Sequence, residues 1–311
     1  MRPILAILQL SSLQRVKMNE FLSSRGIMPK IAFVTDSTAY IPTGLCQKYN
    51  IAVAPQILIW GEETFLDGVD IQPNEFYARL KTAKVMPSTA QVSVVTMQKM
   101  FQGFIDQGYE VLGIFISDKL SGTFQSAIQG REALGKAAEK VVLHDSHSTA
   151  MAMGFQVLSA ARVASDGGSL KDCIAIAEKA RNHTGVYFAV DTLEFLHRGG
   201  RIGGAQRFIG SALNLKPVLA LEDGHIEAID RIRTKTKALD RVVELVAESV
   251  EGKSPVHLAT LHANAEEEAK SLMDKATQQI EVVEKIYTEV SPVVGAHAGP
   301  GTVALAYMAG M

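Results

Sequence analysis

Two clusters of hydroxyl and glycine residues have the composition of an anion-binding loop. One cluster is Pro87–Ser93 and the other is Ser117–Thr123, and a helical pattern follows each of them. The first backbone N–H groups of a helix have no partner within it, so together with nearby hydroxyls they bind anions well. Either cluster alone could be an ordinary helix cap. Because both occur in one half of the chain they favour an anionic ligand, and the candidate residues are Ser88, Thr89, Ser121, Gly122 and Thr123.

Three segments of the second half combine glycines or hydroxyls with cationic or titratable side chains. They are Gly199–Gly204 around Arg201, Arg231–Thr234 with Arg233, and Gly295–Gly301 around His297. The glycines beside His297 predict a tight turn. A single arginine of this kind is as often a solvated surface group as a ligand. The combination with the hydroxyl clusters is more specific, and it points to the same anion.

The familiar signatures of enzymes and metal sites are missing. Gly252–Ser254 resembles the end of a phosphate-binding loop, but Ala247 stands where the first glycine is required and a helix precedes it. His257 and His262 fall on opposite faces of a predicted strand because their spacing is odd, so they cannot share a metal. The motifs H-E-x-x-H, G-x-S-x-G and G-x-G-x-x-G do not occur. We therefore expect no metal and no cofactor.

The elements that must position these residues alternate between short apolar runs and helical patterns. The predicted strands of the first half are Ile31–Thr35, Ile51–Ile59, Val111–Ile116 and Val141–His144. This order predicts a doubly wound parallel sheet of the α/β class, covered by helices. Polar residues such as Asp36–Thr38 and Asp145-Ser146 follow the strands. Ligands bind at the carboxyl ends of strands in open α/β sheets, so a site should form there.

A polar turn with glycines, Ser165–Ser169, ends the helical pattern and marks the predicted domain boundary. We expect residues 28–165 to form the α/β domain and residues 166–311 to form an α+β domain, with the ligand at their junction. In the second domain, Asp223-Gly224 between alternating apolar residues predicts a hairpin over Val218–Ile229. The other predicted elements are the helices Asp172–Asn182, Thr236–Val250 and Ala265–Ala276 and the strands Val186–Val190, Val256–Leu261 and Val282–Thr288.

Composition excludes several classes of protein. The 311 residues include 31 Lys and Arg against 33 Asp and Glu, a net charge of −2, so sequence-independent nucleic-acid binding is not expected. The 47% of hydrophobic residues can bury a large core. Cys46 and Cys173 are isolated from each other, which fits a reducing cytoplasm. No run approaches the roughly 18 apolar residues of a membrane helix, so stable membrane insertion is not expected.

Residues 1–27 are predicted to be an N-terminal extension outside the fold. They carry mostly basic charges and a short apolar run, Ile4–Leu10. This run of about seven residues is at the low end for the apolar region of a secretory signal, and no cleavage site of small residues follows it. The compact fold should begin near Met28.

The motifs taken together resemble the DegV family of bacterial fatty-acid-binding proteins, which includes the FakB subunits of fatty acid kinase. The matching stretches run in family order from residue 30 to the end of the sequence. They are Phe33–Ala39, Leu120–Ala127, Asp145-Ser146, Asp191–Ile202, Lys216–Val218, Arg233-Thr234 and Gly295–Gly301.

The resemblance implies a two-domain fold that encloses one long-chain fatty acid. In the family, hydroxyls of a T-S-Q-P-S motif and an S-G-T motif bind the carboxylate, and these match Thr89 and Ser121. The first motif departs from the family pattern, with Ala90 and Val92 in place of serine and proline. The family also links an arginine pair and a histidine to the head-group end and to a kinase partner. The matching residues are Arg201, Arg233 and His297.

The resemblance further implies that the protein is a carrier and not itself an enzyme. A separate ATP-dependent kinase, similar to dihydroxyacetone kinase, would phosphorylate the presented carboxylate to an acyl phosphate. Burying about 14 methylenes of a C16 tail at roughly 0.8 kcal/mol each gives on the order of 11 kcal/mol before ordering costs. The tail would thus provide the affinity, while neutral hydroxyls orient the carboxylate.

Two other functions stay open at this point. The first is a small hydrolase or transferase with Ser121 as nucleophile and His297 as base, oriented by Asp36 or Asp145. The second is a regulatory protein for which the lipid is a signal. Acyl-chain preference and oligomeric state are not predicted from the sequence.

Overall fold

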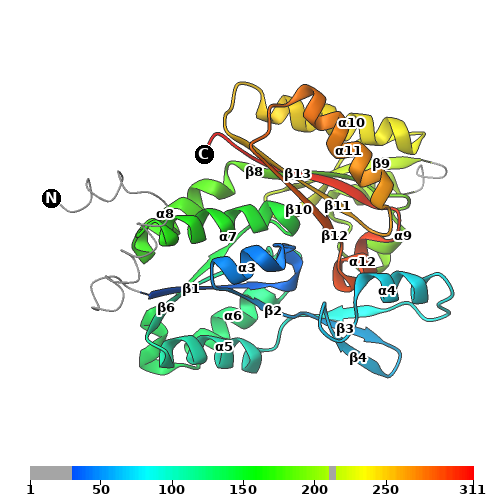
Figure 1. The fold of residues 1–311 in the computed structure, drawn as a ribbon. Coiled ribbons are helices and arrows are strands. Elements are labelled where there is room, and N and C mark those ends of the chain that lie inside the picture. Colours follow the sequence, from blue (N-terminus) through cyan, green and yellow to red (C-terminus); the bar gives the residue numbers. More distant parts are fainter. Residues whose placement is uncertain (1–29, 210–214) are drawn as a thin grey trace.

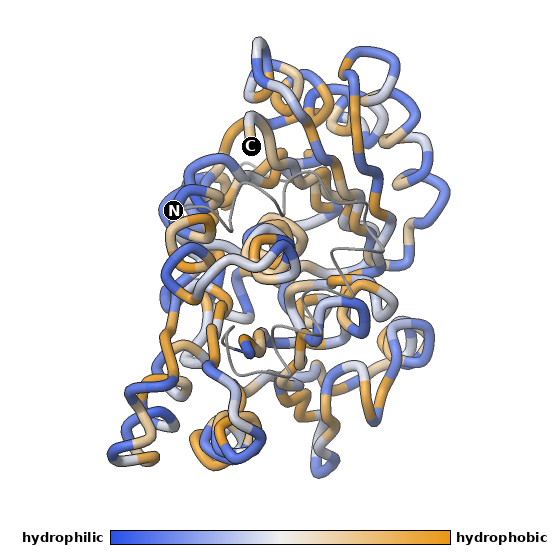
Figure 2. The backbone as a smooth tube through the Cα atoms, turned by 60° about the vertical axis from the view of Figure 1, so that its left-hand side comes forward, coloured by the Kyte–Doolittle hydropathy of each residue, from blue (hydrophilic) through white to orange (hydrophobic). Residues whose placement is uncertain are grey.

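The computed structural model describes residues 30–209 and 215–311, so the predicted extension over residues 1–27 lies outside the described residues. Two sheets lie one above the other, and helix α7 (Ala150–Ser165) packs between them (Figure 1). Hydrophobic segments run along the strands in the middle of the molecule, whereas many outer turns are hydrophilic (Figure 2). Helix α7 therefore packs against both sheets.

The first sheet has four parallel strands in the order β2-β1-β6-β7. They are β1 (Lys30–Asp36), β2 (Ile51–Ala54), β6 (Tyr109–Phe115) and β7 (Val141–Asp145). In β1 the residues from Ala32 to Asp36 are all buried, as expected for a parallel strand covered on both faces. One face carries α5 (Val94–Asp106) and α6 (Thr123–Glu132), and the other carries α7 and α8 (Leu170–Arg181). The predicted doubly wound domain is confirmed.

The predicted strand Ile51–Ile59 is wrong, because this segment forms two strands of different sheets. Pro55 follows β2 and has no N–H to donate to a neighbouring strand, so pairing stops there. The chain then enters a small antiparallel sheet in the order β4-β3-β5. Its strands are β3 (Ile57–Trp60), β4 (Glu63–Leu66) and β5 (Ser88–Ala90), with α4 (Pro73–Leu80) between β4 and β5.

The second sheet has six strands in the order β10-β9-β8-β13-β11-β12. They are β8 (Thr184–Ala189), β9 (Lys216–Glu222), β10 (His225–Ile232), β11 (Val256–His262), β12 (Glu284–Glu289) and β13 (Val303–Ala309). Of these neighbours, β11 and β12 run parallel and the rest run antiparallel. Helices α10 (Lys235–Val250) and α11 (Glu266–Gln279) cover one face, and α7 contacts the other. This mixed domain matches the predicted α+β class.

The predicted hairpin is confirmed, and two later elements were not predicted. Asp223 and Gly224 join β9 to β10 with φ values of 47° and 80°, as a two-residue hairpin turn requires. Strand β13 was missed, although it lies in the middle of the sheet. Helix α12 (Pro292–Ala298) was also missed, because its glycines predicted a turn. The turn begins only at Gly299, with φ of 79°.

The domain boundary near residue 165 stays a prediction. It falls between α7 and α8, and α8 packs against α7 and the first sheet.

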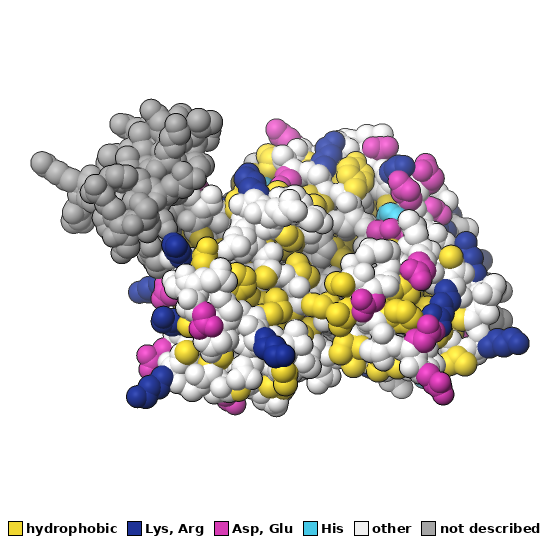
Figure 3. Space-filling view, turned by 60° about the horizontal axis from the view of Figure 1, so that its bottom comes forward, with side chains coloured by type: hydrophobic (Ala, Val, Ile, Leu, Met, Phe, Trp, Pro, Cys, Tyr) yellow, Lys and Arg dark blue, Asp and Glu magenta, His cyan; other side chains and the backbone are white. Residues whose placement is uncertain are grey.

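The remaining short elements are α3 (Thr43–Lys48), α9 (Glu194–Arg198) and the 3-10 helices η1 (Ser37–Ala39), η2 (Gly135–Lys140) and η3 (Gly203–Phe208). None of the helices within the described residues has both the length and the apolar character to cross a membrane. On the face shown in Figure 3, hydrophobic side chains gather over the middle and many charged ones lie toward the edges.

Candidate ligand-binding cavity

A cavity lies at the junction of the two domains. It contains about 970 Å³ of space that no atom fills, including solvent at its mouth. The first domain contributes the ends of β1 and β6, strand β5 and the start of α7. The second contributes β8, the β9–β10 hairpin, β11, α12 and the segment after α9. The site predicted at the strand ends of the parallel sheet therefore faces a cavity.

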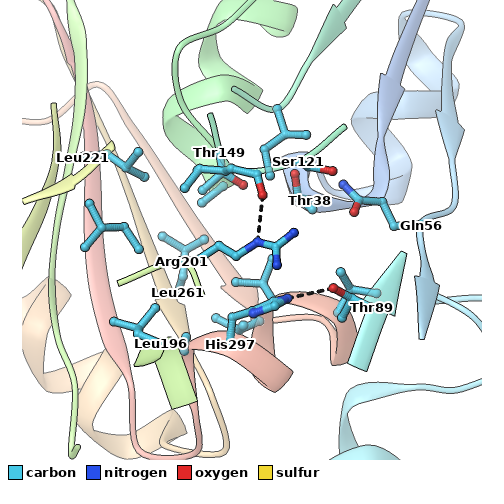
Figure 4. A pocket seen from close by; sticks show the side chains of 18 of the residues that line it. Thr38, Gln56, Thr89, Ser121, Thr149, Leu196, Arg201, Leu221, Leu261 and His297 are labelled. Carbon is cyan, nitrogen blue, oxygen red and sulfur yellow. Dashed lines mark hydrogen bonds between the residues drawn. The ribbon is translucent and has the colours of Figure 1, made fainter. Parts of the chain in front are cut away.

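Four of the predicted site residues line this cavity together. They are Thr89, Ser121, Arg201 and His297. Figure 4 shows their polar groups near one another, together with Thr38 and Gln56. The Oγ1 atom of Thr89 lies 2.7 Å from Nε2 of His297 in a hydrogen bond. The cavity thus has one polar end, to which both domains contribute.

His297 is neutral at pH 7 in this environment. Burial lowers the pKa of its imidazole to about 4, and the nearby positive charge of Arg201 acts in the same direction. When Nε2 carries the imidazole proton, it donates to Thr89, and the hydroxyl proton of Thr89 is then free to donate to a ligand. The Nδ1 atom is buried without a hydrogen-bond partner among the described residues. The pair can therefore offer a neutral donor to an anion.

Arg201 connects the two domains at the polar end. Its Nε donates to the carbonyl of Leu120 at 3.1 Å, and its Nη1 donates to the carbonyl of Gly199 at 2.7 Å. Leu120 precedes Ser121 in the first domain, whereas Gly199 follows α9 in the second. The glycine at position 199 is required by space, because an added Cβ would stand 2.0 Å from Nδ1 of His297. Two backbone carbonyls therefore hold the guanidinium of Arg201 in place, and the side chain also lines the cavity.

The other predicted residues do not line the cavity. Thr123 is fully buried, and its Oγ1 contacts Ser121 Oγ at 3.0 Å and accepts from the Val92 amide at 3.4 Å. A side chain at Gly122 would collide with that of Gln91, since its Cβ would lie 2.9 Å away. These two residues hold the hydroxyl-bearing loops together. Ser88 and Arg233 are exposed, and neither is among the residues that line the cavity.

The role of Asp36 was not recognised from the sequence. Its buried carboxylate accepts hydrogen bonds from the backbone and hydroxyl of Thr38, from the amide side chain of Gln56, and from the Ile116 N–H at 2.8 Å. Burial raises its pKa, while these donors oppose that effect. Asp36 therefore fixes two polar groups of the cavity wall. The sequence showed Asp36 only as a polar residue at a strand end, within the matching stretch Phe33–Ala39, and as a possible partner of His297 in a hydrolase.

These contacts do not form a Ser–His–carboxylate chain within the described residues. Ser121 bonds to Thr123, His297 bonds to Thr89, and Asp36 bonds to neither of them. Asp145 accepts from the backbone of His147 and Asp118. Within residues 30–209 and 215–311, no group of three or more His, Cys, Asp and Glu side chains could hold a metal ion.

Away from this polar end, the cavity wall is apolar. Ile116, Leu120 and Ala150 of the first domain contribute to it. Most of its larger apolar side chains come from the second sheet, from α9 and from the start of α12. They are Val186, Phe188, Leu196, Leu221, Ile226, Leu261, Val290, Val293 and Val294. A wall of this kind stabilises alkyl groups by removing their surface from water. The arrangement suits a molecule with one small polar end and an aliphatic body.

Comparisons with known proteins agree with this architecture. The model of a family described as "Uncharacterised protein, DegV family" matches residues 30–310. A DegV domain-containing protein of Halalkalibacterium halodurans is 34% identical over 283 residues, which are 90% of this chain and 99% of that protein. The similarity thus extends over both domains.

Two solved structures share the whole fold. A DegV family protein of Thermus thermophilus, described by its fatty acid binding, has a TM-score of 0.85 and 32% identity, covering 90% of this chain and 99% of its own. DegV of Bacillus subtilis, described as a fatty acid binding protein, has a TM-score of 0.81 and 32% identity with the same coverage. Together with the family match, these relatives show that the chain belongs to the DegV family.

Proposed function

We propose that the protein binds a single long-chain fatty acid non-covalently in the junction cavity. The observation that carries this proposal is the cavity itself, with hydroxyls at one end and mainly apolar side chains over the rest of its wall. The carboxylate would accept from Thr89 and Ser121, near the guanidinium of Arg201. Charge-assisted hydrogen bonds from neutral groups orient a carboxylate without a fully buried ion pair, so the acid can still leave. The descriptions of the two structural relatives support the same ligand class.

Native mass spectrometry of the purified protein, followed by lipid extraction, tests this proposal. We expect a 1:1 adduct of fatty-acid mass, or uptake of added palmitate or oleate. Thr89→Val and Ser121→Ala should each weaken uptake by roughly tenfold, because each removes a donor to a charged group. Thr64→Val is the matched control, since Thr64 is an exposed threonine of β4 in the same small sheet as Thr89. A lipid-free protein that takes up neither acid would contradict the proposal.

We further propose that a separate ATP-dependent fatty acid kinase, similar to dihydroxyacetone kinase, acts on the bound acid. A carboxylate oxygen would attack the γ-phosphorus of ATP, giving an acyl phosphate and ADP. The family resemblance supports this step. Because Arg233 is exposed and does not line the cavity, its predicted role would be toward the kinase and not toward the lipid.

Acyl phosphate formation by the loaded protein, ATP and a bacterial fatty acid kinase tests this step. Arg233→Ala should keep its lipid and lose most of the turnover, whereas Lys136→Ala, which removes an exposed cation of η2, should keep both. Full turnover by Arg233→Ala would contradict the role of that residue. Acyl phosphate formed without the kinase would contradict the carrier function.

A further inference from the structure

The helix that carries His297 is held at its start by a residue of the other domain. Ser291 precedes α12, but its side chain does not cap the helix. Instead, Oδ1 of Asp67 accepts a hydrogen bond from the Val293 N–H at 3.1 Å. Asp67 follows β4 in the first domain and is only 2% exposed. A carboxylate at this position stabilises the free N–H groups of a helix and the positive end of its dipole.

Two tyrosines of the first domain hold the same turn. The hydroxyl of Tyr40 accepts from the Ser291 N–H at 3.2 Å, and the hydroxyl of Tyr77 donates to the carbonyl of Val290 at 3.0 Å. Gly295 lets the helix approach this closely, because an added Cβ would stand 2.5 Å from the Tyr77 hydroxyl. The first turn of α12 thus lies against the first domain, and its last turn contacts Thr89 through His297.

The second oxygen of Asp67 connects this contact to the cavity wall. Ser37 donates its hydroxyl proton to Oδ2 at 2.6 Å and accepts from the backbone N–H of Gln56 at 3.2 Å. The side chain of Gln56 lines the cavity and donates to Asp36. Asp67 therefore fixes α12 against the same backbone segments that carry the polar wall.

We propose that Asp67 is a positioning residue for the head-group end of the cavity. By capping α12 from the opposite domain, it sets the position of the helix and hence the distance between His297 and Thr89. This inference rests on the proposed fatty-acid function for its effect on affinity, but its effect on His297 can be measured without a ligand.

The test compares Asp67→Ala with Asp67→Asn, which keeps an oxygen for the Val293 N–H. Ser169→Ala is the control, because it removes the capping box of α8, and α8 contributes no residue to the cavity. In ligand-free protein, NMR titration of labelled histidine should show the pKa of His297 rising by roughly one unit in Asp67→Ala, as water reaches the ring. The other two variants should leave it unchanged. Fatty-acid affinity should fall by roughly tenfold in Asp67→Ala alone, a loss of about 1.4 kcal/mol.

Each result decides a separate question. An unchanged His297 pKa in folded Asp67→Ala, or an equal change in Ser169→Ala, would overturn the positioning role. If Asp67→Ala does not fold, Tyr40→Phe removes a second anchor at constant shape and should move the His297 signal in the same direction; no movement there would also overturn it. A wild-type protein that binds no fatty acid would contradict only the proposed function, since the His297 readout is independent of it.

Discussion

The hydrogen bond between Thr89 and His297 joins side chains from the two domains at the polar end of the cavity. Its value for an anionic ligand depends on the imidazole being neutral. A protonated ring would be a second cation beside Arg201 in a buried environment, which desolvation and like-charge repulsion both oppose. Burial keeps the ring neutral, so the donor strength of the site should not change across the physiological pH range.

The lowered pKa of His297 predicts a specific acid sensitivity of the fold. Between pH 6.5 and about 4 the unfolded chain binds this proton and the folded protein does not, so stability falls as the pH is lowered through this window. From pH 7 to pH 4.5 the wild type should lose about 2 to 3 kcal/mol relative to His297→Gln. Urea unfolding at both values measures the difference.

The control for this experiment is His225→Gln, which removes an exposed histidine of β10. Its loss of stability between the two pH values should equal that of the wild type. If His297→Gln also follows the wild type, then folding does not lower the pKa of His297, and the neutral state is not a consequence of its burial.

At this scale the sequence was a good guide to the residues that line the cavity and a poor guide to those that support them. Thr89, Ser121 and His297 carry hydroxyl and imidazole groups in glycine-rich or polar segments, which are visible in a sequence. Asp67 has no such signal, because its burial and its bond to α12 depend on how two distant segments pack. Carboxylates that act across a domain junction are thus the residues that sequence patterns miss.

The β9–β10 hairpin forms part of the cavity wall in the second domain. Leu221 and Ile226 line the cavity, and the tip between them contacts the loop after β6 in the first domain. The carbonyl of Asp223 accepts from Nζ of Lys119 at 2.7 Å. At Gly224 the backbone has φ of 80°, and an added Cβ would stand 2.3 Å from the Ser117 hydroxyl. A side chain at this position would therefore push the tip away from the loop.

Gly224→Ala should open this contact. We expect it to cost at least about 1 kcal/mol more stability than Gly252→Ala, and to release bound fatty acid about tenfold faster. Gly252 is the matched control, since it also has a positive φ of 70° but has no atom within 4 Å of the added Cβ. Chemical unfolding and transfer of a fluorescent fatty acid to vesicles measure the two effects. Equal release rates in both variants would contradict a closing role of the hairpin.

The elements that were predicted correctly are those with local signals. The Asp-Gly turn and the strands of the parallel sheet can each be predicted from a pattern of a few consecutive residues. The break at Pro55 and helix α12 were read wrongly for different reasons. The apolar run from Ile51 to Ile59 looks like one strand but forms two strands of different sheets. In α12, Gly295 allows close packing against Tyr77, and Gly299 follows the last residue of the helix. Local sequence patterns indicate which backbone conformation a segment prefers. The sheet that each strand joins and the packing of α12 depend instead on tertiary contacts.

At the scale of the whole molecule, the two domains share a core. Helix α7 contacts strands of both sheets, and one continuous hydrophobic cluster includes residues of the first sheet, α7 and the second sheet. Hydrogen bonds that involve Asp67 and Tyr40 as acceptors and Tyr77 as a donor cross the same junction. A boundary with this much contact behaves as part of one folding unit and not as a hinge.

We therefore expect a single cooperative unfolding transition. The fluorescence of Trp60, the only tryptophan of the chain, reports on the first domain, and hydrogen exchange in β8 and β13 reports on the second. The two probes should give the same midpoint. Fatty acid at 100 times its Kd should raise the stability of both domains together by about 2.7 kcal/mol. Separate midpoints, with the ligand shifting only one of them, would show that the domains unfold independently.

The place of β13 has a consequence for synthesis on the ribosome. This strand pairs with β8 on one side and β11 on the other, although it follows every other strand of the described residues. All four strands of the first sheet have been synthesised once β7 is complete, well before the second sheet has its middle strand. The second sheet stays in two parts until residues 303–309 leave the exit tunnel. Before that, β8 and β11 each have one edge without the partner strand that β13 provides. The nascent chain therefore depends on its last strand, and truncation just before it should leave a protein that aggregates through those edges.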